Sequence, residues 1–225
     1  MVDISKIIKS KKRVADHGEV FTAEREVNAM LDLVKNETER IDSRFLEPAC
    51  GTGNFLVPIL EKKLSVIKSK YAKSQLEFER YAVIAIGSIY GVDILEDNVR
   101  GCRDRLFNIF NDVYTSLYKI ECKEACRDSI RFILSRNILL GDALSLKTVG
   151  ENAEPIVFSE WSLVTGSQIK RRDYTFADLI SSESARVGLF ADTNVSHLGG
   201  NPFFIPKPVK EYPLCNFLEI HYETN

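Results

Sequence analysis

The stretch Glu47-Pro48-Ala49-Cys50-Gly51-Thr52-Gly53-Asn54-Phe55-Leu56 decides the fold of this chain of 225 residues. The short run Arg44-Phe45-Leu46 before it predicts a buried strand that ends at Glu47. Gly51 and Gly53 allow the backbone to turn sharply and a ligand to approach it closely. A helix is expected to follow, and the first amides of a helix have no partners within it. The pattern therefore predicts a strand, a tight loop and a helix N-terminus that bind a ligand together.

The charge of Glu47 indicates which kind of ligand this loop accepts. In dinucleotide-binding proteins a glycine-rich loop of this kind receives a pyrophosphate at the helix N-terminus. A carboxylate at the start of the loop repels phosphate, and the GxGxxG spacing of those proteins is absent here. A ligand with an ammonium or sulfonium group suits the acid better. S-adenosylmethionine, which has an amino group and no phosphate, meets both conditions.

Two further short apolar runs end in the same way as the first. Ile89-Tyr90-Gly91-Val92-Asp93 predicts one strand, and Ile138-Leu139-Leu140 followed by Gly141-Asp142 predicts another. Strands that alternate with helices predict an α/β fold with a parallel sheet, whose ligands bind at the carboxyl ends of the strands. Helical periodicity covers residues 24–40, 60–88, 96–119 and 123–135.

The character of the sequence changes after Gly150. Prolines cluster between Pro202 and Pro213, and the periodicity weakens. We expect an irregular C-terminal appendage here, with short strands at residues 156–158 and 217–220. The chain is thus predicted to consist of an N-terminal arm and helix (1–40), a ligand-binding core (41–149) and the appendage (150–225).

Composition narrows the class of protein. A hydrophobic content of 44% and a charged content of 28% are typical of a soluble globular protein, and no apolar run is long enough to span a bilayer. Five cysteines without a CxxC pair indicate reduced thiols and a cytoplasmic location. Three widely spaced histidines predict no metal site. The net charge of −2 neither requires nor excludes nucleic acid.

The loop resembles motif I of the adenine-N6 DNA methyltransferases of restriction–modification systems, which reads (Asp/Glu)-Pro-x-Cys-Gly-Thr-Gly-x-Phe. Three shorter stretches resemble other motifs of that family, in the expected order. Residues 18–23 are similar to the Phe-Thr-Pro motif that contacts the methionine part of the cofactor, although Ala23 replaces the proline. Residues 91–94 and 141–144 resemble the second and third cofactor motifs. The resemblance implies a Rossmann-like S-adenosylmethionine-dependent methyltransferase fold with an incomplete sheet, a helical N-terminal segment and S-adenosylmethionine as cofactor.

The resemblance also implies roles for single residues. Asp93 would bind the ribose hydroxyls, Ile94 would pack on the adenine, and Asp142 would accept a hydrogen bond from the adenine amino group. Taken alone, either aspartate also fits an ordinary strand end, and it is their order along the chain that favours a site. The expected cofactor-binding residues are Phe21, Thr22, Glu47, Pro48, Ala49, Cys50, Gly51, Gly53, Asp93, Ile94, Asp142 and Ala143.

The loop with which this family transfers methyl groups, (Asn/Asp/Ser)-Pro-Pro-(Tyr/Phe), is missing from the sequence. It holds the target amine and stacks on the flipped base. The nearest match is Asn201-Pro202-Phe203-Phe204, in which Asn201, Pro202 and Phe204 are catalytic candidates but Phe203 replaces the second proline. A structural loop is the favoured interpretation of this tetrapeptide.

We therefore expect the S-adenosylmethionine-binding subunit or fragment of an adenine-N6 DNA methyltransferase that is inactive as an isolated chain. A second polypeptide would supply the Asn-Pro-Pro-Tyr loop, the target-recognition domain and the contact with DNA, and no membrane is involved. The alternative is a degenerate, non-catalytic methyltransferase that acts as a binding or scaffolding module. A methyltransferase of RNA or of small molecules is a third interpretation, which the form of motif I disfavours.

Overall fold

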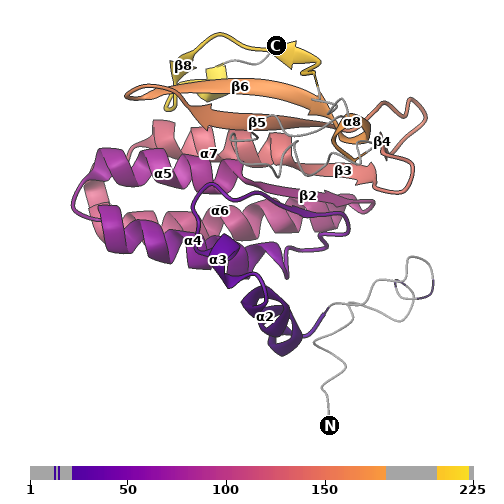
Figure 1. Cartoon of the computed structure of the whole chain (residues 1–225), viewed down its shortest axis with the longest axis horizontal. Coiled ribbons are helices and arrows are strands. Elements are labelled where there is room, and N and C mark those ends of the chain that lie inside the picture. Colours follow the sequence, from indigo (N-terminus) through magenta and orange to yellow (C-terminus); the bar gives the residue numbers. More distant parts are fainter. Residues whose placement is uncertain (1–12, 14, 16–21, 181–206, 223–225) are drawn as a thin grey trace, which may run out of the picture.

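A computed structural model describes residues 13, 15, 22–180 and 207–222, and it has a mixed α/β architecture (Figure 1). Its first sheet contains three parallel strands: β1 (Phe45–Glu47), β2 (Ile89–Asp93) and β3 (Ile138–Asp142). A short antiparallel strand, β4 (Lys147–Thr148), extends the sheet beyond β3 and gives the order β1-β2-β3-β4. Because the three main strands are parallel, their carboxyl ends meet at one edge, where the sequence predicts the site.

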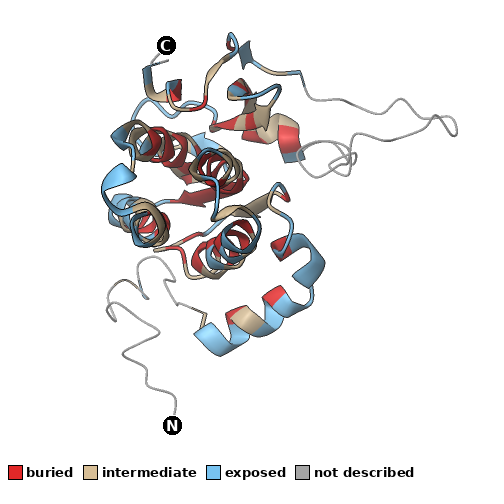
Figure 2. Ribbon diagram, turned by 90° about the vertical axis from the view of Figure 1, so that its left-hand side faces the viewer, coloured by how far each residue is buried: buried red, intermediate tan, exposed pale blue. Residues whose placement is uncertain are grey.

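Four helices connect these strands. Helices α4 (Leu56–Tyr71) and α5 (Gln75–Gly87) join β1 to β2. Helix α6 (Glu96–Tyr118), the 3-10 helix η2 (Lys119–Glu121) and helix α7 (Glu124–Asn137) join β2 to β3. Figure 2 shows the four long helices nearly end-on, with their buried residues turned toward one another. They enclose the helix-side core, which includes Leu60, Ile86, Phe110 and Ile133.

The strands of the first sheet send alternate side chains to two cores, as the strand period of two requires. Ile89 packs into the helix-side core, whereas Tyr90 and Val92 point to the opposite face. There they meet Phe158 and Phe176, and the rings of Tyr90 and Phe158 lie edge to face at 5.4 Å. The sheet-side core consists of Tyr90, Val92, Ile156, Phe158, Phe176 and Leu179.

A second, antiparallel sheet supplies most of this covering layer. It is formed by β5 (Val157–Leu163) and β6 (Gln168–Thr175), with the short strands β7 (Lys210–Glu211) and β8 (Cys215–Asn216) paired to β6. Helix α8 (Phe176–Ile180) follows β6 directly, and the 3-10 helix η3 (Ile220–Tyr222) follows β8.

A buried ion pair lies within the second sheet. The guanidinium of Arg171 contacts the carboxylate of Asp173 at 2.8 Å, and it lies 3.9 Å from the ring centroid of Tyr212. The Tyr212 hydroxyl donates to the same carboxylate at 2.9 Å. Buried charges persist in proteins when they are paired and hydrogen-bonded in this way.

The structure confirms the α/β class and corrects several expected boundaries. Residues 150–225 are not irregular throughout, because β5 and β6 form a long hairpin. Residues 217–220 form no strand: β8 ends at Asn216 and a turn leads into η3. The helix expected over 24–40 is two helices, α2 (Glu24–Asp32) and α3 (Lys35–Thr38), and Ala23 occupies the N-cap position of α2.

Within the described part of the chain, no helix combines the length and the apolar character needed to cross a membrane.

Gly141, in β3, leaves no room for a side chain between the first sheet and Ile156 of the layer that covers it. A Cβ atom added there would lie 2.5 Å from Ile156 Cδ1 and 3.1 Å from the Lys147 carbonyl oxygen. We expect Gly141→Ala to lower the free energy of unfolding by about 1–3 kcal/mol, because it overpacks the core. Gly101→Ala is the matched control, since its Cβ would meet only Thr52 Cγ2 at 3.5 Å on the helix surface. That variant should gain about 0.5–1 kcal/mol from better helix propensity. Urea denaturation measures both, and equal effects of the two substitutions would contradict this account of Gly141.

Candidate ligand-binding site

The loop after β1 has the tight geometry that its glycines predict. Gly51 and Gly53 have positive φ angles of 52° and 89°, in a region that side chains rarely adopt. The Gly53 amide donates to the Cys50 carbonyl at 2.8 Å, and the Val57 amide donates to the Gly53 carbonyl at 2.9 Å. These bonds lead the turn directly into the expected helix, α4, which begins at Leu56.

Asp93 ties this loop to the neighbouring strand. Its carboxylate ends β2 and accepts a hydrogen bond from the Gly51 amide at 2.9 Å. The same carboxylate accepts from the Leu95 amide at 2.8 Å and from the Asn98 side-chain amide at 3.2 Å. A further bond, from the Cys50 amide to the Val92 carbonyl at 2.9 Å, holds the loop against β2. The structure thus joins two of the predicted groups into one constellation.

Glu47 and Cys50, at the two ends of the first half of the loop, differ in exposure: Glu47 is half-buried and Cys50 is buried. The Glu47 carboxylate accepts only a long hydrogen bond from the Ala49 amide, at 3.3 Å, among the interactions recorded for the described residues. Partial burial raises the pKa of Glu47 above its ordinary value, and the Ala49 bond opposes that shift. Cys50 is buried, and its hydrogen bond with the Cys102 thiol together with burial raises its pKa strongly. A thiol with a raised pKa is a poor nucleophile, so Cys50 acts as a packing residue.

Gly91 explains why the loop can pack so closely on β2. A Cβ atom at Gly91 would lie 3.0 Å from the Cys50 sulfur and 3.1 Å from Leu56 Cδ1. The absence of a side chain in the middle of β2 therefore makes room for the loop and for the first turn of α4.

Asp142, Ile94 and Ala143 lie near the loop and Asp93, but no recorded hydrogen bond joins their side chains to either. Asp142 ends β3, and its exposed carboxylate accepts from the Leu144 amide at 2.9 Å and the Ser145 amide at 3.3 Å. The Leu144 bond, the larger cause, lowers the pKa of Asp142. Ile94 follows Asp93 with 43% of its surface exposed. Half-buried Ala143 packs against the sheet-side core.

Three of the remaining expected residues, Thr22, Pro48 and Ala49, are described but make no recorded contact with Asp93. Pro48 and Ala49 form the exposed tip of the turn. Thr22 is half-buried just before α2, and no recorded contact joins it to the loop. Phe21 and the tetrapeptide 201–204 lie outside the described residues, so their expected roles stay predictions.

Sequence reasoning missed three polar residues at the site: Asn98, Arg13 and Arg105. Asn98 is 1% exposed and connects Asp93 to Arg13, whose guanidinium donates to the Asn98 side-chain oxygen at 3.2 Å. Arg13 also forms an ion pair with Asp97 at 2.9 Å. Asn98 lies in the first turn of α6, five residues after Asp93, and that spacing was the available signal.

Arg105 supports the loop from the same helix. Its guanidinium donates to the Thr52 carbonyl at 2.8 Å and to the Asn54 side-chain oxygen at 3.0 Å. Nothing in the local sequence indicates these contacts, because Thr52 and Asn54 lie about fifty residues before Arg105 in the chain.

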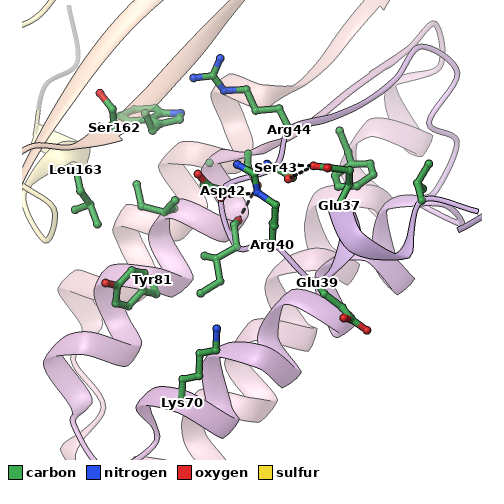
Figure 3. A pocket seen from close by; sticks show the side chains of 17 residues that line it. Glu37, Glu39, Arg40, Asp42, Ser43, Arg44, Lys70, Tyr81, Ser162 and Leu163 are labelled. Atoms are coloured by element: carbon green, nitrogen blue, oxygen red, sulfur yellow. Dashed lines mark hydrogen bonds and ion pairs between the residues drawn. The ribbon is translucent and has the colours of Figure 1, made fainter. Parts of the chain in front are cut away.

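A separate hollow lies at the amino end of β1. It has a volume of about 970 Å³ and is bordered by Ser43–Phe45, by α5 and by β5. Figure 3 shows Glu37, Arg40, Asp42 and Ser43 joined by hydrogen bonds and ion pairs at its rim, with Ser162 and Leu163 on the far wall. We call this hollow the amino-end groove. It is separate from the loop and Asp93, which lie at the carboxyl ends of the strands.

The constellation brings together several groups that can bind a ligand. Backbone amides, one carboxylate ending each of three parallel strands and an exposed apolar side chain lie at one edge. Among the described residues no cluster of histidine, cysteine, aspartate or glutamate could hold a metal ion.

Comparison with known proteins leaves the family open. No family model, no curated protein and no solved structure matches this chain. Any functional conclusion therefore rests on the sequence motifs and on the geometry of the site.

Proposed function

We propose that the chain is the S-adenosylmethionine-binding part of an adenine-N6 DNA methyltransferase with a Rossmann-like fold. The single observation that carries this proposal is the hydrogen bond between the Gly51 amide and the Asp93 carboxylate, at 2.9 Å. It joins the glycine loop after β1 to the acid that ends β2. That arrangement supports a ligand held at the carboxyl edge of a parallel sheet.

The charges at this edge support a cationic ligand. Glu47, Asp93 and Asp142 each end one of three neighbouring parallel strands. A phosphate would meet carboxylates on every strand, whereas an ammonium or sulfonium group is attracted to them. Ile94, exposed at the end of β2, offers an apolar surface for an adenine ring.

The rest of the proposed enzyme lies on a second polypeptide. It would supply the Asn-Pro-Pro-Tyr loop, the target-recognition domain and the contact with DNA, since the nearest tetrapeptide here has Phe203 in place of the second proline. A proline fixes the backbone, and its loss frees the carbonyl that would have to face the target amine.

Isothermal titration calorimetry with S-adenosylmethionine tests the proposal directly. We expect S-adenosylmethionine to bind the full chain, and ATP to bind at least about a hundredfold more weakly because its phosphates face the three acids. S-adenosylhomocysteine, which lacks the sulfonium charge but keeps the amino group and ribose, should also bind. Binding of ATP as tightly as S-adenosylmethionine would refute a cation-selective site.

The raised pKa of Glu47 adds a pH dependence to this binding. Burial favours the neutral carboxylic acid, whereas a bound cation favours the carboxylate. As the pH falls through the raised pKa, the ligand must displace a proton, so its affinity should fall there and stay level at higher pH. Glu47→Gln removes the titrating group and should give a weaker affinity that changes less between pH 4.5 and 7. A Glu47→Gln variant that retains the full pH dependence would place the titrating group elsewhere.

A further inference from the structure

Arg13, in the N-terminal arm, contacts the first turn of α6. Its Nη1 atom donates to Asp97 Oδ2 at 2.9 Å, and its Nη2 atom donates to Asp97 Oδ1 at 3.2 Å. A planar guanidinium fits a carboxylate in this two-bond geometry, which an ammonium group cannot reproduce. The side chains of Arg13 and Asp97 are 25% and 48% exposed, so the pair fixes the position of Arg13 and adds little to stability.

The position of this ion pair on the helix explains why Asp97 is needed. Asp97 follows Glu96, the first residue of α6, and lies at the end of the helix that carries the positive part of the helix dipole. That end attracts acids and repels a cation such as Arg13. The Asp97 carboxylate offsets this repulsion and holds the guanidinium through two hydrogen bonds.

Asn98 continues the contact into the protein interior. Arg13 Nη2 donates a second hydrogen bond, to Asn98 Oδ1 at 3.2 Å, and Asn98 Nδ2 donates to Asp93 Oδ1 at 3.2 Å. One end of an amide accepts and the other donates, so a cation at the first end and a carboxylate at the second fix the orientation of the buried Asn98 side chain. The two charged partners also polarise the amide in the same sense, which strengthens both bonds.

The bond from Asn98 determines which acceptor position of Asp93 stays available. Asp93 Oδ1 accepts from the Leu95 amide at 2.8 Å and from Asn98, and these two bonds occupy both of its lone pairs. Asp93 Oδ2 accepts from the Gly51 amide at 2.9 Å, which is the one hydrogen bond recorded for that oxygen among the described residues. The second lone pair of Oδ2 therefore lies beside the glycine loop, where the proposed ligand binds.

We propose that Arg13 is a positioning residue for the ribose of the ligand. Through Asn98 it holds the Asp93 carboxylate in the orientation that leaves Oδ2 to accept from a ribose hydroxyl. Arg13 itself makes no contact with the ribose, and Asp97 acts by holding Arg13. The inference rests on the proposed function for the identity of the ligand, whereas the link from Arg13 through Asn98 and Asp93 to Gly51 exists in the free chain.

Two ligands that differ in the ribose hydroxyls alone test the positioning role. Isothermal titration calorimetry of the full chain compares S-adenosylhomocysteine with its 2′,3′-dideoxy analogue. Arg13→Met keeps much of the side-chain length and removes the donors. It should weaken the binding of S-adenosylhomocysteine about fivefold and leave that of the analogue within about twofold, because the analogue makes no use of Oδ2. Equal losses for the two ligands would overturn the proposal.

Arg100→Met is the matched control for the loss of a positive charge. Arg100 is an exposed arginine of the same helix, and its replacement should leave both affinities within about twofold of wild type. A selective loss in Arg100→Met as large as that in Arg13→Met would mean that net charge sets the affinity. That result would overturn the role of the contact with Asn98.

A double-mutant cycle tests whether Arg13 acts through Asn98. Asn98→Ala removes the bond to Asp93 and should produce the selective loss by itself. Arg13→Met should then weaken the binding of S-adenosylhomocysteine less than about 1.5-fold further in the Asn98→Ala background. Losses that multiply in the double variant would show another route from Arg13 to the ligand and overturn the proposal. If Asn98→Ala does not fold, Asp97→Ala, at an exposed position, takes its place in the cycle with the same expected result.

Hydrogen exchange of the free chain distinguishes failure of this inference from failure of the proposed function. NMR measures the exchange of the Gly51 amide, whose acceptor is Asp93. Exchange should become at least about threefold faster in Arg13→Met and stay unchanged in Arg100→Met, because a less constrained carboxylate releases that amide more often. Unchanged exchange in Arg13→Met would refute the link even if S-adenosylmethionine binds. Faster exchange in a chain that binds neither S-adenosylmethionine nor S-adenosylhomocysteine would support the link but refute the proposed function, and with it the ribose as the group that Asp93 faces.

Discussion

Replacing Lys63 by methionine is expected to lower the free energy of unfolding by about 3 kcal/mol or more. Lys63 lies in α4 with 0% of its surface exposed, and its ammonium donates to the carbonyls of Arg40, Ile41 and Ser43 at 3.0, 2.9 and 2.6 Å. It also donates to the Ser88 hydroxyl at 2.9 Å. Methionine keeps the length of the side chain but leaves these acceptors without a donor, at about 1 kcal/mol or more for each.

Lys62→Met provides the control for this substitution. Lys62 is the neighbouring residue of α4, and its recorded interaction among the described residues is a surface ion pair of 3.7 Å with Asp32. Exposed pairs of this kind contribute about 0–1 kcal/mol. Guanidinium denaturation monitored by circular dichroism measures both variants. Similar losses for Lys62→Met and Lys63→Met would mean that the polar contacts of Lys63, three N–H donors shared among four acceptors, do not fasten the segment before β1.

The same lysine gives folding stability a distinct pH dependence. Burial lowers the pKa of Lys63 from its ordinary value of 10.5 to about 7 in the folded protein. Between these values the unfolded chain binds a proton that the folded chain does not, so the stability conferred by this group rises with pH. The stability difference between wild type and Lys63→Met should therefore grow from pH 7 to pH 9, by at most about 1.4 kcal/mol per pH unit. A constant difference would show that burial leaves the pKa of Lys63 unshifted.

Local signals in the sequence predicted the parallel strands and the loop well. The runs that end at Glu47, Asp93 and Asp142 are β1, β2 and β3, because a short apolar run bounded by glycine or an acid has few alternatives to a buried strand. The turn at Gly51 and Gly53 followed from the backbone freedom of glycine. One local signal was overlooked: Ser74 caps α5, accepting from the Glu77 amide at 3.4 Å, and ends the single helix expected over 60–88.

The features that sequence reasoning missed depend on contacts between distant segments. Lys63 follows another lysine and has the local pattern of a solvent-exposed residue, yet its acceptors come from residues 40–43 and from Ser88. Arg171 and Asp173 likewise belong to a charged run that is typical of a surface. Alternation along β6 turns both inward, where each finds a charged partner in the other. No local pattern distinguishes such paired buried charges from solvated ones.

Replacing Asp93 by alanine is expected to weaken S-adenosylmethionine binding about a hundredfold, if the proposed function holds. The Asp93 carboxylate accepts three hydrogen bonds from the chain, at 2.8–3.2 Å, and a carboxylate has about four acceptor positions. About one position is left for a ribose hydroxyl, and a hydrogen bond to a charged group contributes about 1.5–3 kcal/mol. Alanine also releases the Gly51 amide and so loosens the loop that faces the ligand.

A ligand without ribose hydroxyls separates these two effects. The 2′,3′-dideoxy analogue of S-adenosylhomocysteine should bind wild type about tenfold more weakly than S-adenosylhomocysteine itself, and both ligands should bind Asp93→Ala equally weakly. Asp93→Asn should fail as a rescue, because every recorded neighbour of the carboxylate is a donor and the new amide group would face one of them. Asp112→Asn, an exposed acid farther along α6, serves as the control and should leave both affinities unchanged. If the dideoxy analogue lost the same affinity in Asp93→Ala as in wild type, Asp93 would support the loop without touching the ribose.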